Sequence, residues 1–88
     1  MANIEIYSHP SCGFCQQAKA LLDSRGVAYD EHDVSRNKAA LIDMQQRTQG
    51  RTLPQIIIND QAIGGYDRLR VLDQQGLLAD LVNDGIEL

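Results

Sequence analysis

The two cysteines of this chain, Cys12 and Cys15, lie two residues apart between a strand-like segment and a helix-like segment. Before them, apolar and polar side chains alternate over residues 4–7, as they do in a β-strand. After them, apolar residues recur at helical spacing from Phe14 to Leu22. This order restricts the chain to folds in which two thiols stand where a strand turns into a helix.

The position of the cysteines predicts thiol chemistry. A helix N-terminus has unpaired N–H groups and a partial positive charge, which favour a thiolate over a thiol. Cys12 precedes the helix and is expected to be the exposed nucleophile, while Cys15 lies one turn further in, within reach but less accessible. A disulfide that closes so short a loop removes little entropy from the unfolded chain. Both arguments favour a redox role over a structural disulfide.

Size and charge narrow the class of partner. The 88 residues, 43% of them hydrophobic, are expected to form one small domain over residues 1–88. The net charge is −4 and no basic stripe is present, which argues against nucleic acid as a partner. No apolar run approaches the ~20 residues of a membrane span, and residues 1–5 lack the pattern of a signal peptide. We therefore expect a cytoplasmic protein that binds neither membranes nor nucleic acid.

The first half of the chain predicts a βαβ unit followed by a helix. Residues 3–8 form the first strand, the first helix runs over residues 14–25, and Gly26 is a suitable residue to end it. Residues 27–31 then read as a second strand, which a right-handed crossover would place parallel to the first. Ser35 is the expected N-cap of a second helix, which runs to Thr48. The expected buried face of this helix carries Ala40, Leu41 and Met44.

The second half predicts a hairpin and two further helices. Residues 55–59 and 61–63 are expected to form antiparallel strands around a turn at Asn59-Asp60. Asp67 is the expected N-cap of a helix that ends at Gly76. A short C-terminal helix is expected to follow, with Leu77, Leu78, Leu81 and Val82 on its apolar face.

The order β-α-β-α-β-β-α-α indicates the α/β class. The βαβ unit supplies a parallel half and the hairpin an antiparallel half of a four-stranded mixed sheet flanked by helices. With Cys-x-x-Cys at the start of the first helix, this order predicts a thioredoxin-like fold.

A second motif, Thr52-Leu53-Pro54, precedes the third predicted strand. If the Leu53–Pro54 bond were cis, Leu53 would present its backbone N–H and C=O to an incoming chain, as an edge strand does. On local grounds a proline that simply begins a strand is the commoner case, because about 5–6% of X–Pro bonds are cis.

A third motif, Gly64-Gly65-Tyr66-Asp67, precedes the third predicted helix. The free N–H groups of a helix N-terminus can bind a carboxylate, and a neighbouring aspartate can hold an ammonium group. Together they would fit the α-amino acid end of a glutamate. The alternative is an ordinary loop that ends in an N-cap.

These motifs, at this spacing, resemble those of the dithiol glutaredoxins, and the resemblance runs over nearly the whole chain. It rests on Ile6-Tyr7-Ser8, Cys12-Gly13-Phe14-Cys15, residues 18–22, Thr52-Leu53-Pro54-Gln55 and Ile63-Gly64-Gly65-Tyr66-Asp67. The resemblance implies a glutathione-dependent thiol–disulfide oxidoreductase that reduces protein disulfides and glutathione mixed disulfides. It also makes a cis Leu53–Pro54 bond the expectation.

The family's roles carry over by position. Cys12 would accept the glutathionyl group, and Cys15 would resolve mixed disulfides with protein substrates. The Leu53 backbone would pair with the glutathione cysteine, Asp67 would hold the γ-glutamyl end, and Arg51 would meet the glycine carboxylate. The glutathione-binding residues that the resemblance implies are His9, Phe14, Arg51, Thr52, Leu53, Pro54, Gly65, Tyr66 and Asp67. Lys38 and Arg47 are further candidates for the glycine carboxylate.

The chain departs from the family's usual pattern in three places. His9 stands where a lysine is common, so glutathione binding and thiolate stabilisation would be weaker or would depend on pH. Gly13 and Phe14 stand where many dithiol members have proline and tyrosine. Arg68 follows Asp67 where a second acidic residue is common, and it adds a positive charge near the site.

The departure at Gly13 leaves a second function open. Glutaredoxins without proline at this position tend to bind a [2Fe–2S] cluster, to which two protomers and two glutathione molecules would each supply thiolates, here through Cys12. A third possibility is a protein reduced by thioredoxin reductase, against which Arg51 and Asp67 argue. Zinc is less favoured, because His9 and His32 lack the paired spacing of zinc modules. We expect a monomer that uses glutathione and needs no metal.

Overall fold

The computed structural model describes residues 3–78 and places a four-stranded mixed sheet at its centre, with strand order β2-β1-β3-β4. The strands are β1 (Ile4–Ser8), β2 (Asp30–Asp33), β3 (Gln55–Ile58) and β4 (Gln61–Gly64). The helices are α1 (Gly13–Ser24), α2 (Lys38–Thr48) and α3 (Tyr66–Gln74). β1 pairs parallel with β2 and antiparallel with β3, and β3 pairs antiparallel with β4. The predicted thioredoxin-like architecture is confirmed.

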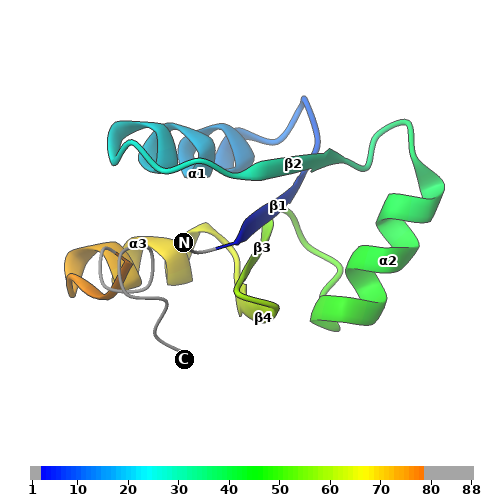
Figure 1. The fold of residues 1–88 in the computed structure, drawn as a ribbon. Coiled ribbons are helices and arrows are strands. Elements are labelled where there is room, and N and C mark those ends of the chain that lie inside the picture. Colours follow the sequence, from blue (N-terminus) through cyan, green and yellow to red (C-terminus); the bar gives the residue numbers. More distant parts are fainter. Residues whose placement is uncertain (1–2, 79–88) are drawn as a thin grey trace.

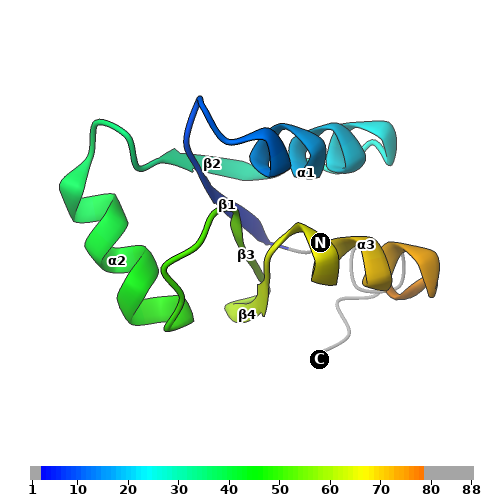
Figure 2. The same ribbon diagram turned by 180° about the vertical axis from the view of Figure 1, so that it is seen from behind.

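Helices cover both faces of this sheet. Figure 1 and the reverse view in Figure 2 show α1 and α3 side by side against one face and α2 against the other. Side chains alternate between the faces of each strand, so β1 and β3 contribute to a separate core on either side. The core under α1 and α3 consists of Ile4, Ile6, Ala18, Leu22, Ile56, Ile58, Leu69, Leu72 and Leu78. The core under α2 consists of Tyr7, Val34, Met44 and Ile57.

The second strand begins three residues later than the pattern predicts. Val27 was expected in the strand, but its N–H donates to the Leu22 carbonyl at 3.1 Å and completes the end of α1. Gly26 has φ 67°, the left-handed conformation that this type of helix ending requires. Pairing with β1 therefore begins at Asp30, opposite Glu5. The strand predicted over residues 27–31 shares only residues 30 and 31 with β2, because the backbone of Val27, its first predicted residue, takes part in the ending of α1.

Two predicted helix caps are also wrong. Asn37, not Ser35, caps α2, because the Asn37 side chain accepts a hydrogen bond from the Ala40 N–H at 3.0 Å. Ser35 instead donates its own N–H to the Asp33 carboxylate at 2.8 Å, within a preceding turn. Gly65 is the N-cap of α3, which places Asp67 inside the first turn.

The predictions of the hairpin turn and of the buried face of α2 are confirmed. Asn59 and Asp60 both have positive φ, as the tight turn of a hairpin requires. The predicted inner face of α2 is confirmed, with Met44 fully buried. Leu77 and Leu78 are helical, and the rest of the predicted C-terminal helix lies outside the described residues. Within residues 3–78, no helix has both the length and the apolar character needed to cross a membrane.

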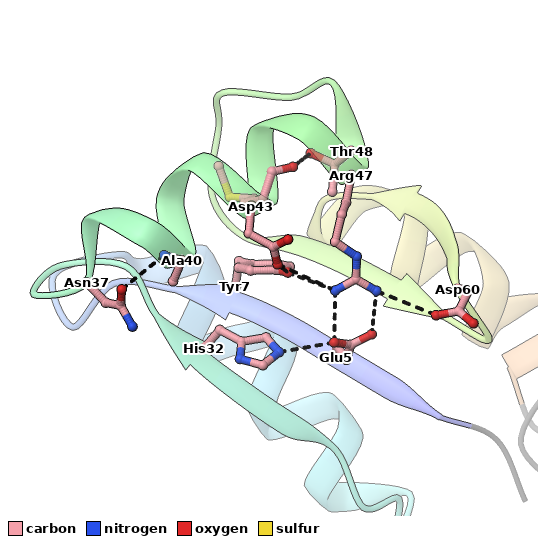
Figure 3. A network of polar contacts seen from close by, with 10 residues as sticks. Glu5, Tyr7, His32, Asn37, Ala40, Asp43, Arg47, Thr48 and Asp60 are labelled. Atoms are coloured by element: carbon pink, nitrogen blue, oxygen red, sulfur yellow. Dashed lines mark hydrogen bonds and ion pairs between the residues drawn. The ribbon is translucent and has the colours of Figure 1, made fainter.

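A polar network fixes α2 to the sheet (Figure 3). Arg47 of α2 forms two hydrogen bonds to the Glu5 carboxylate of β1, at 2.7 and 2.9 Å, and a third to the Tyr7 hydroxyl at 2.8 Å. The Tyr7 hydroxyl donates to Asp43, and His32 of β2 lies 3.1 Å from Glu5. The network holds the helix that leads into the loop of residues 49–54.

Candidate active site

The loop between β1 and α1 places Cys12 at the N-terminus of the helix. Cys12 is the N-cap of α1, with extended backbone, and its Sγ accepts a hydrogen bond from the Cys15 N–H at 3.1 Å. The Cys12 N–H donates to the His9 carbonyl at 3.0 Å, which closes a turn before the helix. An N–H donor and the positive end of the helix both stabilise negative charge on this sulfur.

Cys15 occupies a different environment, as predicted. Its side chain is 0% exposed, whereas Cys12 is half-buried. Burial raises the pKa of the Cys15 thiol to about 12, with a further contribution from the neighbouring Cys12. Both cysteines are free thiols in this structure. The pair therefore combines one accessible sulfur with one sealed behind it.

The loop before β3 carries the second motif. The Leu53–Pro54 bond is cis, which confirms the expectation from the resemblance. Within residues 3–78, no hydrogen bond engages the backbone N–H or C=O of Leu53. An edge of backbone is therefore open beside Pro54.

The Gln55 side chain holds this loop through hydrogen bonds, a role that was not predicted from the sequence. Its buried side-chain amide donates to the Thr52 carbonyl at 2.9 Å and to the Thr52 hydroxyl at 3.2 Å. Gly50 packs directly on this amide: a Cβ on Gly50 would lie 2.5 Å from Gln55 Nε2. The signal in the sequence was a glutamine at the start of an otherwise apolar strand.

The N-terminus of α3 meets the same loop. A Cβ on Gly65 would lie 3.3 Å from the Pro54 carbonyl oxygen, tighter than a side chain is usually placed. Glycine at this position therefore allows α3 to begin close beside the cis-proline loop. Tyr66 and Asp67 follow in the first turn of the helix.

A groove of about 430 Å³ lies between these segments. The Phe14 ring of α1, 59% exposed, stacks on the Tyr66 ring of α3 with centroids 6.1 Å apart, and both line the groove. The full lining is Phe14, Thr52, Leu53, Pro54, Gly65, Tyr66, Asp67 and Arg68. Seven of these eight are among the nine predicted glutathione-binding residues, and Arg68 is the addition.

The two remaining predicted residues lie outside the groove lining. His9 Nδ1 accepts a hydrogen bond from the Ser11 N–H at 3.0 Å, so its ring supports the turn before Cys12. Arg51 is exposed in the loop that follows α2. Arg47, a further candidate for the glycine carboxylate, is instead engaged by Glu5 and Tyr7 on the far face of the sheet (Figure 3).

The histidines and cysteines do not assemble into a metal site. Among residues 3–78, no group of three or more His, Cys, Asp or Glu side chains is arranged to hold a metal ion. His32 packs against Tyr7 and approaches Glu5, which places it in the network under α2. The [2Fe–2S] alternative draws its ligands from two protomers and two glutathione molecules, so it stays a prediction.

Comparison with known proteins agrees with the geometry. A family model described as glutaredoxin matches residues 4–63. Glutaredoxin 3 of Escherichia coli strain K12 is 45% identical over 82 residues, which cover 93% of this chain and 99% of that protein. The solution structure of glutaredoxin from Brucella melitensis is similar with a TM-score of 0.84 at 36% identity, covering 100% of this chain and 96% of that one.

A crystal structure of a buckwheat glutaredoxin–glutathione complex has a TM-score of 0.85 at 26% identity, covering 94% of this chain and 78% of that one. The similarity thus extends from sequence to architecture, and it includes the helix start that carries Cys12 and Cys15. The chain belongs to the glutaredoxin family and is a thiol–disulfide oxidoreductase with a thioredoxin-like fold.

Proposed function

We propose that this protein is a glutathione-dependent oxidoreductase that reduces glutathione mixed disulfides and protein disulfides. The observation that carries the proposal is the groove beside Phe14, which brings three segments distant in sequence together around a single space. Its volume of about 430 Å³ suits a tripeptide, since small-ligand pockets are commonly ~300–1,000 Å³. That a related buckwheat glutaredoxin forms a glutathione complex supports the same ligand.

Each part of the groove suits one part of glutathione. The open backbone of Leu53 can pair with the cysteinyl residue in the manner of an added strand. The N–H groups at the start of α3 can bind the γ-glutamyl carboxylate, and Asp67 can pair with its ammonium group. Arg51, outside the groove lining, can meet the glycine carboxylate from the loop.

The reaction with a glutathionylated substrate uses Cys12 alone. The Cys12 thiolate attacks the glutathione sulfur, the mixed disulfide of Cys12 and glutathione forms, and the substrate leaves as a thiolate that takes up a proton. A second glutathione, as its thiolate, then attacks the glutathione sulfur on Cys12. Glutathione disulfide leaves and the Cys12 thiolate is restored.

The reaction with a protein disulfide uses both cysteines. Cys12 attacks one substrate sulfur and releases the other, which leaves a mixed disulfide between Cys12 and the protein. Cys15 then attacks Cys12, a Cys12–Cys15 disulfide forms, and the reduced protein leaves. Glutathione reduces the enzyme again. Because both routes consume glutathione, we place the protein in a reducing compartment such as the cytoplasm.

Turnover with glutathione as the electron donor tests the proposal. Purified protein is expected to reduce the mixed disulfide of glutathione and a small thiol when glutathione and glutathione reductase are supplied. The parallel assay replaces them with thioredoxin reductase, which should support little turnover. Activity with thioredoxin reductase and none with glutathione would overturn the proposed donor while leaving the family assignment intact.

Asp67→Asn is expected to raise KM for the glutathione mixed disulfide about tenfold with little change in kcat. A charge-assisted hydrogen bond contributes about 1.5–3 kcal/mol, and substrate and transition state share the γ-glutamyl contact, so its loss weakens both equally. Asp30→Asn is the matched control, because Asp30 is an exposed aspartate in the edge strand β2. Equal KM values in the two variants would remove Asp67 from the binding site.

A further inference from the structure

A lysine lies one helical turn beyond the buried cysteine. Cys15 and Lys19 are four residues apart in α1, and residues at this spacing are neighbours on a helix surface. Cys15 belongs to the buried face of the helix, and the Lys19 side chain lies at the edge of that face with 19% exposure. A cation is thus placed beside a thiol that solvent does not reach.

Groups from two strands hold this lysine in place. The Lys19 ammonium donates to the Glu31 carboxylate of β2 at 2.8 Å, and the Ser8 hydroxyl at the end of β1 donates to the same oxygen at 2.5 Å. β1 and β2 are paired here, with Glu31 opposite Ile6. The cluster of Ser8, Lys19 and Glu31 therefore joins α1 to the parallel half of the sheet.

The cluster is close to the thiol that must ionise in the proposed mechanism. The buried Cys15 thiol must become a thiolate before it can attack Cys12, yet burial raises its pKa to about 12. A hydrogen bond from the His9 backbone acts in the opposite direction and lowers the pKa of Cys15, and so does the Lys19 ammonium. Desolvation strengthens this interaction, since charges interact more strongly away from water.

Other ionisable side chains act on Cys15 and Lys19. Cys12 opposes ionisation of Cys15, and Tyr29 and Glu31 face Lys19 from the segment that contains β2. From α3, Asp73 pairs with Arg25, one residue beyond α1 at its opposite end. Lys19 is thus the side-chain cation that favours the Cys15 thiolate.

We propose that Lys19, held by Glu31 and Ser8, is a positioning residue for the resolving step, in which it stabilises the Cys15 thiolate as that sulfur attacks the mixed disulfide on Cys12. The inference rests on the cysteine roles in the proposed function. Cys15 loses its proton, the Cys15–Cys12 bond forms, the bond from Cys12 to the substrate sulfur breaks, and the departing thiolate takes up a proton, so that no net proton is gained or lost. The glutathionyl-transfer route does not involve Cys15, so Lys19 serves only the dithiol route.

A single-turnover reaction with one equivalent of 2,2′-dithiodipyridine separates the two steps. Attack by Cys12 releases the first thiopyridone, and attack by Cys15 on the resulting mixed disulfide releases the second. Lys19→Met should leave the first release unchanged and slow the second about tenfold near neutral pH, because a smaller fraction of Cys15 is ionised. The pH profile of the second release should shift upward by about one unit, and Lys19→Arg should restore the rate.

The controls make each outcome decisive. Arg70→Met removes one positive charge from the exposed surface of α3 and should leave both releases unchanged. Lys19→Met with an unchanged second release would overturn the inference, and so would equal slowing of both releases, since Lys19 would then act on Cys12. A wild-type protein with no second release would instead overturn the assignment of Cys15 as the resolving thiol. Thermal unfolding of each variant identifies any loss caused by misfolding, and Lys19→Arg then provides the test.

Discussion

Cys12→Ser is expected to reduce thiol–disulfide exchange by at least about a thousandfold, whereas Cys15→Ser is expected to keep most of the glutathionyl-transfer activity. The two sulfurs differ in access: Cys12 is half-buried at the helix start, and Cys15 is 0% exposed. Cys15 cannot replace Cys12 as nucleophile, because burial raises its pKa to about 12 and excludes substrate. A serine hydroxyl at position 12 is far less nucleophilic than a thiolate.

The substrate separates the two roles. With a glutathione mixed disulfide, Cys15→Ser should turn over within a few-fold of wild type, because glutathione itself regenerates Cys12. With a protein disulfide, the same variant should lose at least about tenfold, because the mixed disulfide then waits for an external thiol. Coupled assays with glutathione reductase measure both. Equal loss of glutathionyl transfer in the two variants would contradict the assigned roles.

The local patterns of the sequence predicted the elements that carry the chemistry. Alternation around Ile4 and Ile6, helical spacing after Cys15, and three successive isoleucines from Ile56 are strong signals, and each corresponds to a strand or a helix face in the core. β2 was misplaced because its residues, Asp-Glu-His-Asp, are all polar and give no strand pattern. Its position is set by backbone pairing with β1 and by the end of α1, and neither is visible locally.

Most residues that line the groove could be predicted, but only from the family resemblance and not from local sequence patterns. No local pattern shows that Phe14, Leu53 and Asp67 meet, since they come from three segments far apart in the chain. The family resemblance supplied that juxtaposition. It did not supply Gln55, whose amide supports Thr52, because a buried polar contact depends on the packing of the loop above it.

The polar network of Arg47, Glu5 and Tyr7 could not be predicted from the sequence either. Arg47 and Glu5 are 42 residues apart, and no local pattern in the sequence pairs them. In the structure the Glu5 side chain is 13% exposed and the Arg47 side chain 29% exposed. An ion pair this sheltered is costly to break from one side, because the remaining charge keeps its desolvation penalty.

Arg47→Met is therefore expected to lower the free energy of unfolding by about 2–3 kcal/mol, less than the 3–5 kcal/mol of a fully buried pair because water reaches part of the site. The midpoint of thermal unfolding should fall by about 10 °C or more in a chain of this size. Arg70→Met is the matched control, an exposed arginine of α3, and should change the midpoint by a degree or two at most. Equal midpoints for the two variants would show that the network contributes little.

The pH dependence of the free energy of unfolding tests whether the stability lost in Arg47→Met comes from the interaction with Glu5. The hydrogen bonds from Arg47 outweigh burial and, with His32, lower the pKa of Glu5 from 4.5 to about 2. A lowered pKa contributes stability that is fully present above the unfolded value of about 4.5 and is lost as pH falls toward about 2. Wild type should therefore lose more stability than Arg47→Met over this interval, and the stabilities of the two proteins should converge in acid.

Other carboxylates with lowered pKa, such as Glu31, titrate in both proteins and cancel in the difference. A gap that stays constant from pH 6 to about pH 2 would assign the lost stability to packing of the arginine side chain instead of its charge on Glu5.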